Sequence, residues 1–114
     1  MQEGLKKNSE FSRVYETGKS VACRDLVLYK KENDLPYNRL GISVSKKVGN
    51  SVVRHRVKRL IRESYRLNRE IIEKGYDLVV IARPNAKGEG YDQICKSLLY
   101  LCKKHGLMRK SGEV

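Results

Sequence analysis

Lysine and arginine side chains, which bind phosphate and carboxylate groups, are concentrated in one part of this chain. The nine that lie between positions 46 and 69 are Lys46, Lys47, Arg54, Arg56, Lys58, Arg59, Arg62, Arg66 and Arg69. Glu63 is the one acidic residue in that stretch, which therefore holds eight of the net +12 charges of the chain. Such a concentration favours a polyanionic partner: nucleic acid is the leading candidate, and an anionic membrane surface is the second.

Hydrophobic periodicity predicts that most of these cations lie on a helix. Either Asn50 or Ser51 can cap its N-terminus. The residues that follow at helical spacing on one arc are Val53, Val57, Leu60, Ile61, Ser64 and Leu67. On the remaining surface, Arg54 begins a row of cations at i, i+4 spacing, and like charges at that spacing destabilise an isolated helix. A polyanion would convert this repulsion into binding, whereas the alternative is an ordinary solvated face.

Residues that could catalyse hydrolysis are few. The two histidines, His55 and His105, could serve as acid and base in a self-sufficient ribonuclease, which is one alternative function. A generic RNA-binding protein is the other. The carboxylates show no spacing typical of metal ligands. Cys23, Cys95 and Cys102 lack C-x-x-C spacing and are interpreted as small buried thiols. The sequence therefore predicts no catalytic residue, no metal site and no cofactor of its own.

Two aromatic residues, Phe11 and Tyr15, lie one turn apart on a first helix that Ser9 can cap and that Gly18 ends. Buried side chains of the core are one interpretation of this pair. A platform on which unpaired bases stack is the other.

Two strand regions follow, at residues 20–31 and 39–45, and the first could divide in two. Within the second, Leu40 belongs to an apolar face, while Gly41 and Ser43 belong to a small polar face that would allow close approach to the sheet. Tyr29 could lie beside that polar face. A plain solvated sheet face is the alternative.

The remaining chain predicts a buried strand at residues 78–82, a final amphipathic helix from Tyr91 to Cys102, and a frayed basic tail from about Lys103. The order α-β-β-α-β-α indicates an α+β fold in one domain, residues 1–114: a small sandwich with a central sheet of about four strands and flanking helices. The chirality rule for βαβ units favours a right-handed crossover. The N-terminus has no apolar signal segment and no run could span a membrane, so a cytoplasmic location is expected.

At the basic stretch the sequence resembles a known family. The run GISVSKKVGNSVVRHRVKRLIRE is similar to the signature of the protein subunit of bacterial ribonuclease P, and the likeness extends from about Leu5 to Arg109. The usual Arg-Asn-Arg-x-Lys-Arg core reads Arg54-His55-Arg56-Val57-Lys58-Arg59 here, so that His55 replaces the asparagine.

This resemblance implies a left-handed βαβ crossover and a division of labour with RNA. Catalysis would belong to an RNA subunit and its Mg²⁺, with precursor tRNA as the second partner and no membrane or obligate protein partner. The residues expected to bind RNA are Lys46, Lys47, Arg54, His55, Arg56, Lys58, Arg59, Arg62 and Arg66. The residues expected in a cleft for the single-stranded 5′ leader of precursor tRNA are Phe11, Tyr15, Tyr29 and Ser43, with Arg62 beside them.

Overall fold

The computed structural model describes residues 4–109. Its elements run in the order α1 (Asn8–Thr17), β1 (Lys19–Ala22), β2 (Leu26–Glu32), β3 (Arg39–Ser43), α2 (Ser51–Asn68), β4 (Tyr76–Ala82) and α3 (Tyr91–Lys104). Short 3₁₀ turns, Arg69–Ile71 and Pro84–Ala86, follow α2 and β4. The predicted α+β order is confirmed, and the first strand region does divide into β1 and β2.

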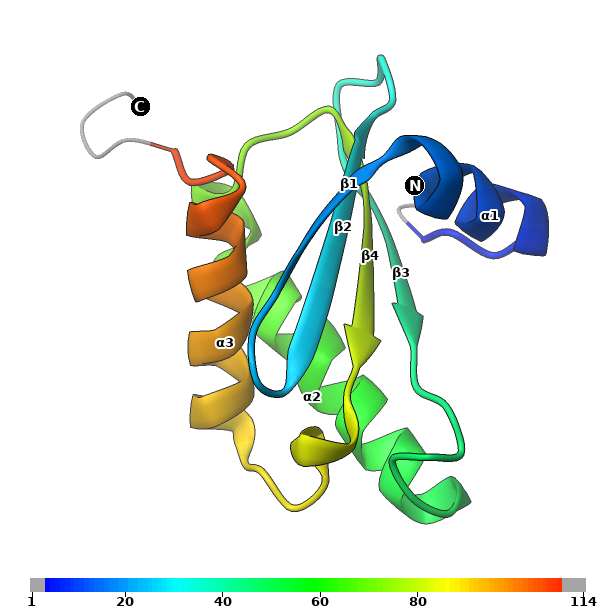
Figure 1. Cartoon of the computed structure of the whole chain (residues 1–114). Helices are drawn as coiled ribbons and strands as arrows, with labels where there is room; N and C mark the ends of the chain where they lie inside the picture. Colours follow the sequence, from blue (N-terminus) through cyan, green and yellow to red (C-terminus); the bar gives the residue numbers. More distant parts are fainter. Residues whose placement is uncertain (1–3, 110–114) are drawn as a thin grey trace.

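The four strands form one mixed sheet in the order β1-β2-β4-β3. β2 pairs antiparallel with both β1 and β4, and β3 pairs parallel with β4. Because β4 lies inside the sheet, its run from Leu78 to Val80 is buried on both faces, as the continuous apolar run predicts. In Figure 1, α2 lies behind the sheet and β3 lies to the right of β4, with both arrows pointing down, so the crossover is left-handed.

The sheet separates two cores. The larger one lies between the sheet and the pair α2 and α3, and Leu28, Val80 and Ile61 are fully buried in it. The smaller one lies under α1, where Leu5 and Val14 pack on Val79. Figure 1 shows α1 apart from α2 and α3. Helix α1 thus packs on one face of the sheet, and α2 and α3 pack on the other.

Helix α2 begins as predicted, because the Asn50 side chain accepts a hydrogen bond from the Val53 amide at 3.0 Å. Its inward face includes Val57 and Ile61, but Tyr65 is buried and Leu67 is 58% exposed. The assignment of Leu67 to the buried arc is wrong. It lies at the border of that arc, near the end of the helix, where Tyr65 takes the inward place.

Helix α1 begins differently from the prediction. Lys7 is its N-cap residue, and the Glu10 carboxylate accepts hydrogen bonds from the amides of Lys6 and Lys7 at 3.0 and 3.1 Å. The expected Ser9 cap is wrong, because the helix already begins at Asn8 and Ser9 is its second residue. The helix does end at Gly18, whose amide donates to Val14 O at 2.8 Å.

The chain after Lys103 is ordered as far as residue 109, so the predicted frayed tail is wrong there. Helix α3 continues to Lys104, and Leu107 is fully buried in the larger core. His105 contributes a ring nitrogen that lies 2.8 Å from Leu28 O on β2. The segment is also held by backbone hydrogen bonds, from Glu73 N to Leu107 O at 2.6 Å and from Arg109 N to Ile71 O at 2.8 Å. Residues 110–114 lie outside the described part of the chain.

Candidate RNA interface

A basic groove runs along α2 beside the β3 edge of the sheet. Three hollows of about 280, 460 and 240 Å³ follow one another there, because Lys58 lines the first two and Arg62 lines the last two. Arg54 and Arg69 line the two ends. None of the described residues lining these hollows is acidic. The row of cations that is unfavourable on an isolated helix therefore faces a groove where an anion could neutralise it.

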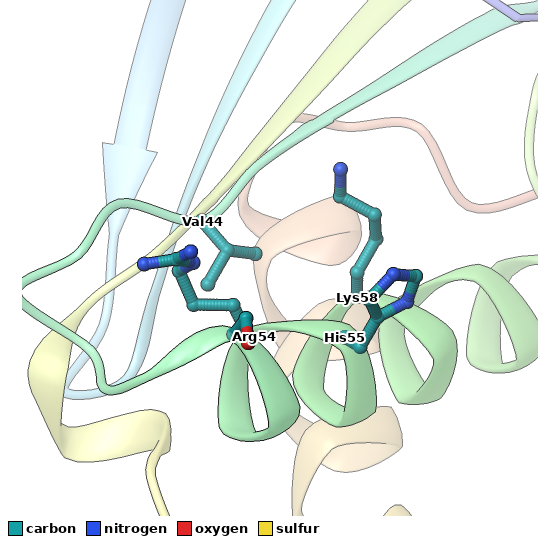
Figure 2. A pocket seen from close by; sticks show the side chains of 5 residues that line it. Val44, Arg54, His55 and Lys58 are labelled. Atoms are coloured by element: carbon teal, nitrogen blue, oxygen red, sulfur yellow. The ribbon is translucent and has the colours of Figure 1, made fainter.

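Figure 2 shows the end of this groove nearest the start of α2. Arg54 lies beside Val44, while Lys58 and His55 project from the next turn of the helix. Arg54 donates to Gly49 O at 3.3 Å, which holds its guanidinium near the loop that precedes α2. These side chains come from the loop that follows β3 and from α2, so the hollow depends on the connection between β3 and α2.

A second basic surface lies on the outer side of α2. His55, Arg56 and Arg59 line a hollow of about 540 Å³ there, beside Val52, which is 75% exposed. His55 lines this hollow and the first hollow of the groove, so it lies on the ridge between the two surfaces. A substitution at His55 can therefore affect either surface.

The turn before α2 presents two further cations. Lys46 and Lys47 are exposed, and the next residue, Val48, is 2% exposed and packs in the larger core. Val48 thus fixes the turn and leaves both ammonium groups in solvent.

Arg66 differs from the other predicted RNA-binding residues. Its guanidinium makes a two-pronged contact with Glu63, from Nε to Oε1 at 3.0 Å and from Nη2 to Oε2 at 2.6 Å. The hydrogen bonds with Arg66 lower the pKa of Glu63, so both groups are charged at neutral pH. Arg66 lines the third hollow, but an RNA phosphate there would have to compete with Glu63.

The predicted cleft residues are close together in space. The ring centroids of Phe11 and Tyr15 are 6.4 Å apart, and those of Tyr15 and Tyr29 are 5.1 Å apart with the edges tilted towards the faces. Partial burial raises the pKa of the Tyr15 hydroxyl, which is hydrogen-bonded to Ser43. The hydroxyl therefore stays neutral, and Tyr15 remains 38% exposed. An exposed, uncharged ring held by its neighbours suits base stacking.

The surroundings of Phe11 are compatible with both interpretations of this ring, as a core side chain and as a platform for bases. Its ring packs so closely on Gly41 that a Cβ there would lie 2.7 Å from the Phe11 Cζ atom. The same ring lines the 460 Å³ hollow, together with Lys58 and Arg62 from α2. The small polar face of β3 is thus where Phe11 approaches, and the aromatic cluster continues into the basic groove.

Sequence reasoning missed Lys6 and gave Arg69 no role in the interface, although both line the groove. Lys6 takes part because the preceding segment pairs with the β3 edge, where the Leu5 amide donates to Leu40 O at 2.9 Å. Leu5 and Leu40 are far apart in the sequence, and no local pattern indicates their contact.

The two histidines do not form a catalytic pair. His55 lies in the first part of α2, and His105 follows α3. The start of α2 and the end of α3 lie at opposite corners of the molecule in Figure 1. Among residues 4–109, no group of three histidine, cysteine, aspartate or glutamate side chains could bind a metal ion. Also within this range, no helix has the length and apolar character to span a bilayer.

An α+β fold with a basic groove, and with aromatic rings at one side of it, defines a protein class suited to binding single-stranded or folded nucleic acid. Comparison with known proteins makes this specific. The model of the Ribonuclease P family matches residues 1–106. The ribonuclease P protein component of Lachnoclostridium phytofermentans is 54% identical over 97% of this chain and 96% of its own. That of Alkaliphilus metalliredigens is 54% identical over 91% and 94%.

Solved structures agree. The ribonuclease P protein of Staphylococcus aureus superposes with a TM-score of 0.88 at 41% identity, over 96% of this chain and 100% of that one. The protein of Thermotoga maritima gives 0.83 at 33% identity, over 90% and 97%. The chain belongs to the ribonuclease P protein family. It is thus part of a tRNA-processing endoribonuclease whose catalysis is carried out by RNA.

Proposed function

We propose that this protein uses two neighbouring surfaces for two RNAs. The outer surface of α2, the turn before it and the end of the basic groove nearest that turn bind the ribonuclease P RNA, and Lys58 lies where the two surfaces meet. The aromatic cluster and the adjoining part of the basic groove bind the single-stranded 5′ leader of precursor tRNA. The observation that carries this proposal is the shared 460 Å³ hollow, in which Phe11 lies with Lys58 and Arg62. One hollow thus offers a ring for a base and two cations for phosphate.

The leader site requires little sequence selectivity, since one protein must serve many precursors. Stacking on Phe11 and Tyr15 accepts any base, because every base has an aromatic face. Tyr29 and Ser43 hold Tyr15 in place on the sheet side. Arg62 neutralises a backbone phosphate without reading a base.

The site for the RNA subunit is the larger one. Its residues, six cations and His55, are exposed or half-exposed and come from the turn before α2 and from the first turns of that helix: Lys46, Lys47, Arg54, His55, Arg56, Lys58 and Arg59. Folded RNA is recognised mainly through its backbone and shape. The rigid helix α2 gives these cations fixed spacing, which suits one folded partner.

Mg²⁺ enters this proposal with the RNA subunit and the substrate, whose phosphates supply its ligands. The protein side chains would lower the repulsion between two RNAs rather than hold the ion. The proposed location is the cytoplasm.

Cleavage of precursor tRNA by purified protein, with and without a bacterial ribonuclease P RNA, tests this function. We expect no cleavage by the protein alone, and stimulation of the RNA at low salt and low Mg²⁺. Phe11→Ala should weaken binding of precursor tRNA relative to mature tRNA, by about 1–3 kcal/mol if one base stacks there. Cleavage by the protein alone that persists after nuclease treatment and is lost in His55→Ala would instead support the self-sufficient ribonuclease.

A further inference from the structure

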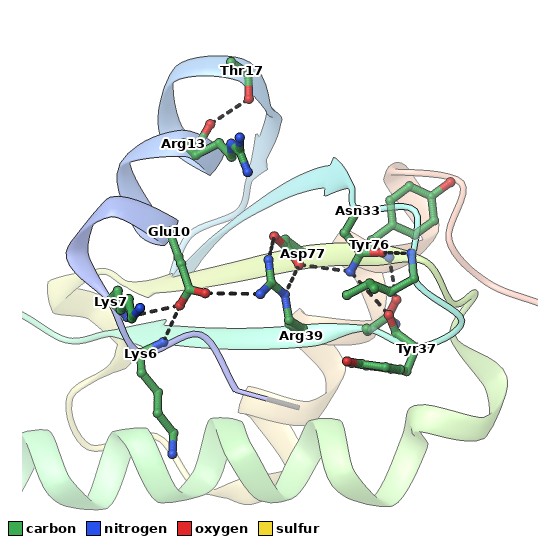
Figure 3. A network of polar contacts seen from close by, with 12 residues as sticks. Lys6, Lys7, Glu10, Arg13, Thr17, Asn33, Tyr37, Arg39, Tyr76 and Asp77 are labelled. Carbon is green, nitrogen blue, oxygen red and sulfur yellow. Dashed lines mark hydrogen bonds and ion pairs between the residues drawn. The ribbon is translucent and has the colours of Figure 1, made fainter. Parts of the chain in front are cut away.

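One arginine joins α1 to the middle of the sheet. Arg39, the first residue of β3, donates from Nε to Asp77 Oδ1 at 2.8 Å and from Nη2 to Oδ2 at 2.7 Å. Its Nη1 donates to Glu10 Oε2 at 3.1 Å. Figure 3 shows the resulting chain of contacts from α1 through Arg39 to β4. All three guanidinium nitrogens thus face protein carboxylates, which leaves no nitrogen aimed at a phosphate.

Glu10 connects this arginine to the start of α1. Its second oxygen, Oε1, accepts the amide hydrogen bonds of Lys6 and Lys7 that begin the helix. These backbone hydrogen bonds are the main cause that lowers the pKa of Glu10, and the charge of Arg39 adds to the effect. The carboxylate is therefore charged at neutral pH and fixes the first turn of α1 to β3.

Asp77 provides the other fixed point. Its side chain is only 5% exposed. Burial opposes its charge, but hydrogen bonds from Arg39 and Asn33 outweigh burial, and the pKa of Asp77 is lowered. Without the two-pronged contact from Arg39, the buried carboxylate of Asp77 would keep one side-chain donor, Asn33 at 2.9 Å. Loss of Arg39 is thus expected to disturb both ends of the chain of contacts.

These contacts hold the same end of α1 that carries the proposed leader site. Phe11 follows Glu10 in the helix, and its ring packs on Gly41, two residues after Arg39. Tyr15 lies one turn further along, against Tyr29. The separation between α1 and β3 is therefore set by two adjacent contacts, one ionic and one aromatic.

We infer that Arg39 is a positioning residue for the leader of precursor tRNA: it holds α1 at the distance from β3 at which Phe11 and Tyr15 can stack on bases, and it does not touch RNA itself. The inference rests on the proposed function of the cleft. Small displacements of positioned groups have large effects on binding and rate. A planar, two-pronged contact is also one that lysine cannot reproduce.

The test compares Arg39→Lys, which keeps the charge, with Arg39→Gln, which removes it. In both variants, the preference of the complete ribonuclease P for precursor over mature tRNA should fall by about tenfold, because stacking of one base would be partly lost. Affinity for the RNA subunit should not change. The slope of log affinity against log salt should also stay the same, because no phosphate contact is lost. Lys104→Ala, on α3 across the sheet, is the control for a lost charge and should leave the preference unchanged.

Two results would overturn the inference. A salt slope reduced by about one in Arg39→Gln would mean that Arg39 contacts a phosphate. An unchanged preference in a folded Arg39→Lys protein would leave Arg39 with a structural role only. If the Arg39 variants do not fold, Glu10→Gln should lower the preference in the same way, and no change there would equally reject the idea. Native protein without any preference for precursor tRNA would instead reject the proposed function.

Discussion

A methyl group at Gly41 would test the close approach between α1 and the sheet. In Gly41→Ala, the new Cβ would lie 2.7 Å from Cζ and 2.8 Å from Cε1 of Phe11, and 3.2 Å from Cβ of Leu5. Carbon atoms in contact are ordinarily about 3.5–4.0 Å apart. The Phe11 ring must therefore move outwards by about 1 Å, and α1 must move with it or the ring must leave the sheet.

The expected magnitude follows from two opposing effects. Overpacking of a well-packed site costs about 1–3 kcal/mol. Replacement of glycine by alanine within a strand returns about 0.5–1 kcal/mol of backbone entropy. We expect the free energy of unfolding to fall by up to about 2 kcal/mol, and the preference for precursor over mature tRNA to fall with it, since Phe11 no longer lies where a base can stack.

Urea unfolding followed by circular dichroism measures the first effect, and competition between the two tRNA forms measures the second. Gly90→Ala is the matched control, because no heavy atom lies within 4 Å of a Cβ at that position. Gly41→Ala protein with native stability and an unchanged precursor preference would refute the role given to the contact between Phe11 and Gly41.

Two further predictions concern charge. Lys58→Ala should weaken binding to the RNA subunit and reduce the salt slope by about one, whereas an unchanged slope would remove Lys58 from the phosphate contacts. Burial and the neighbouring Asp25 raise the pKa of Glu89 to about 7, well above the ordinary value of a glutamate, and the buried Glu89 Oε1 meets no donor among the described residues. Because the folded pKa is the higher one, stability should fall as pH rises from about 5 to 7, and Glu89→Gln should abolish this fall in urea unfolding measured across that range.

Local sequence patterns were sufficient to predict the order of the helices and strands and the basic face of α2. The Asn50 cap, the inward Val57 and Ile61, and the end of α1 at Gly18 all follow from interactions within a few residues. The small face around Gly41 was also readable, because alternation along a strand assigns side chains to faces.

Contacts between distant parts of the chain could not be predicted from the sequence. Arg39 and Asp77 are 38 positions apart, and no spacing rule relates them. The tail was misread because a single buried leucine, Leu107, gives no periodic signal. The sequence pattern placed Leu67 on the buried arc in place of Tyr65, because the residues at the border of a helical arc are decided by what packs against the helix. The left-handed crossover contradicts the general chirality rule and was indicated by the family resemblance alone.

The inner position of β4 has a consequence for synthesis. β4 is the last strand to leave the ribosome, yet it lies between β2 and β3 and bonds to both. Until residues 76–82 emerge, β3 lacks β4, its partner strand in the sheet, and one edge of β2 stays open, a state that favours pairing with other chains. β3 and the start of α2 also carry the groove. The groove between α2 and the β3 edge is therefore complete only after β4 has been synthesised.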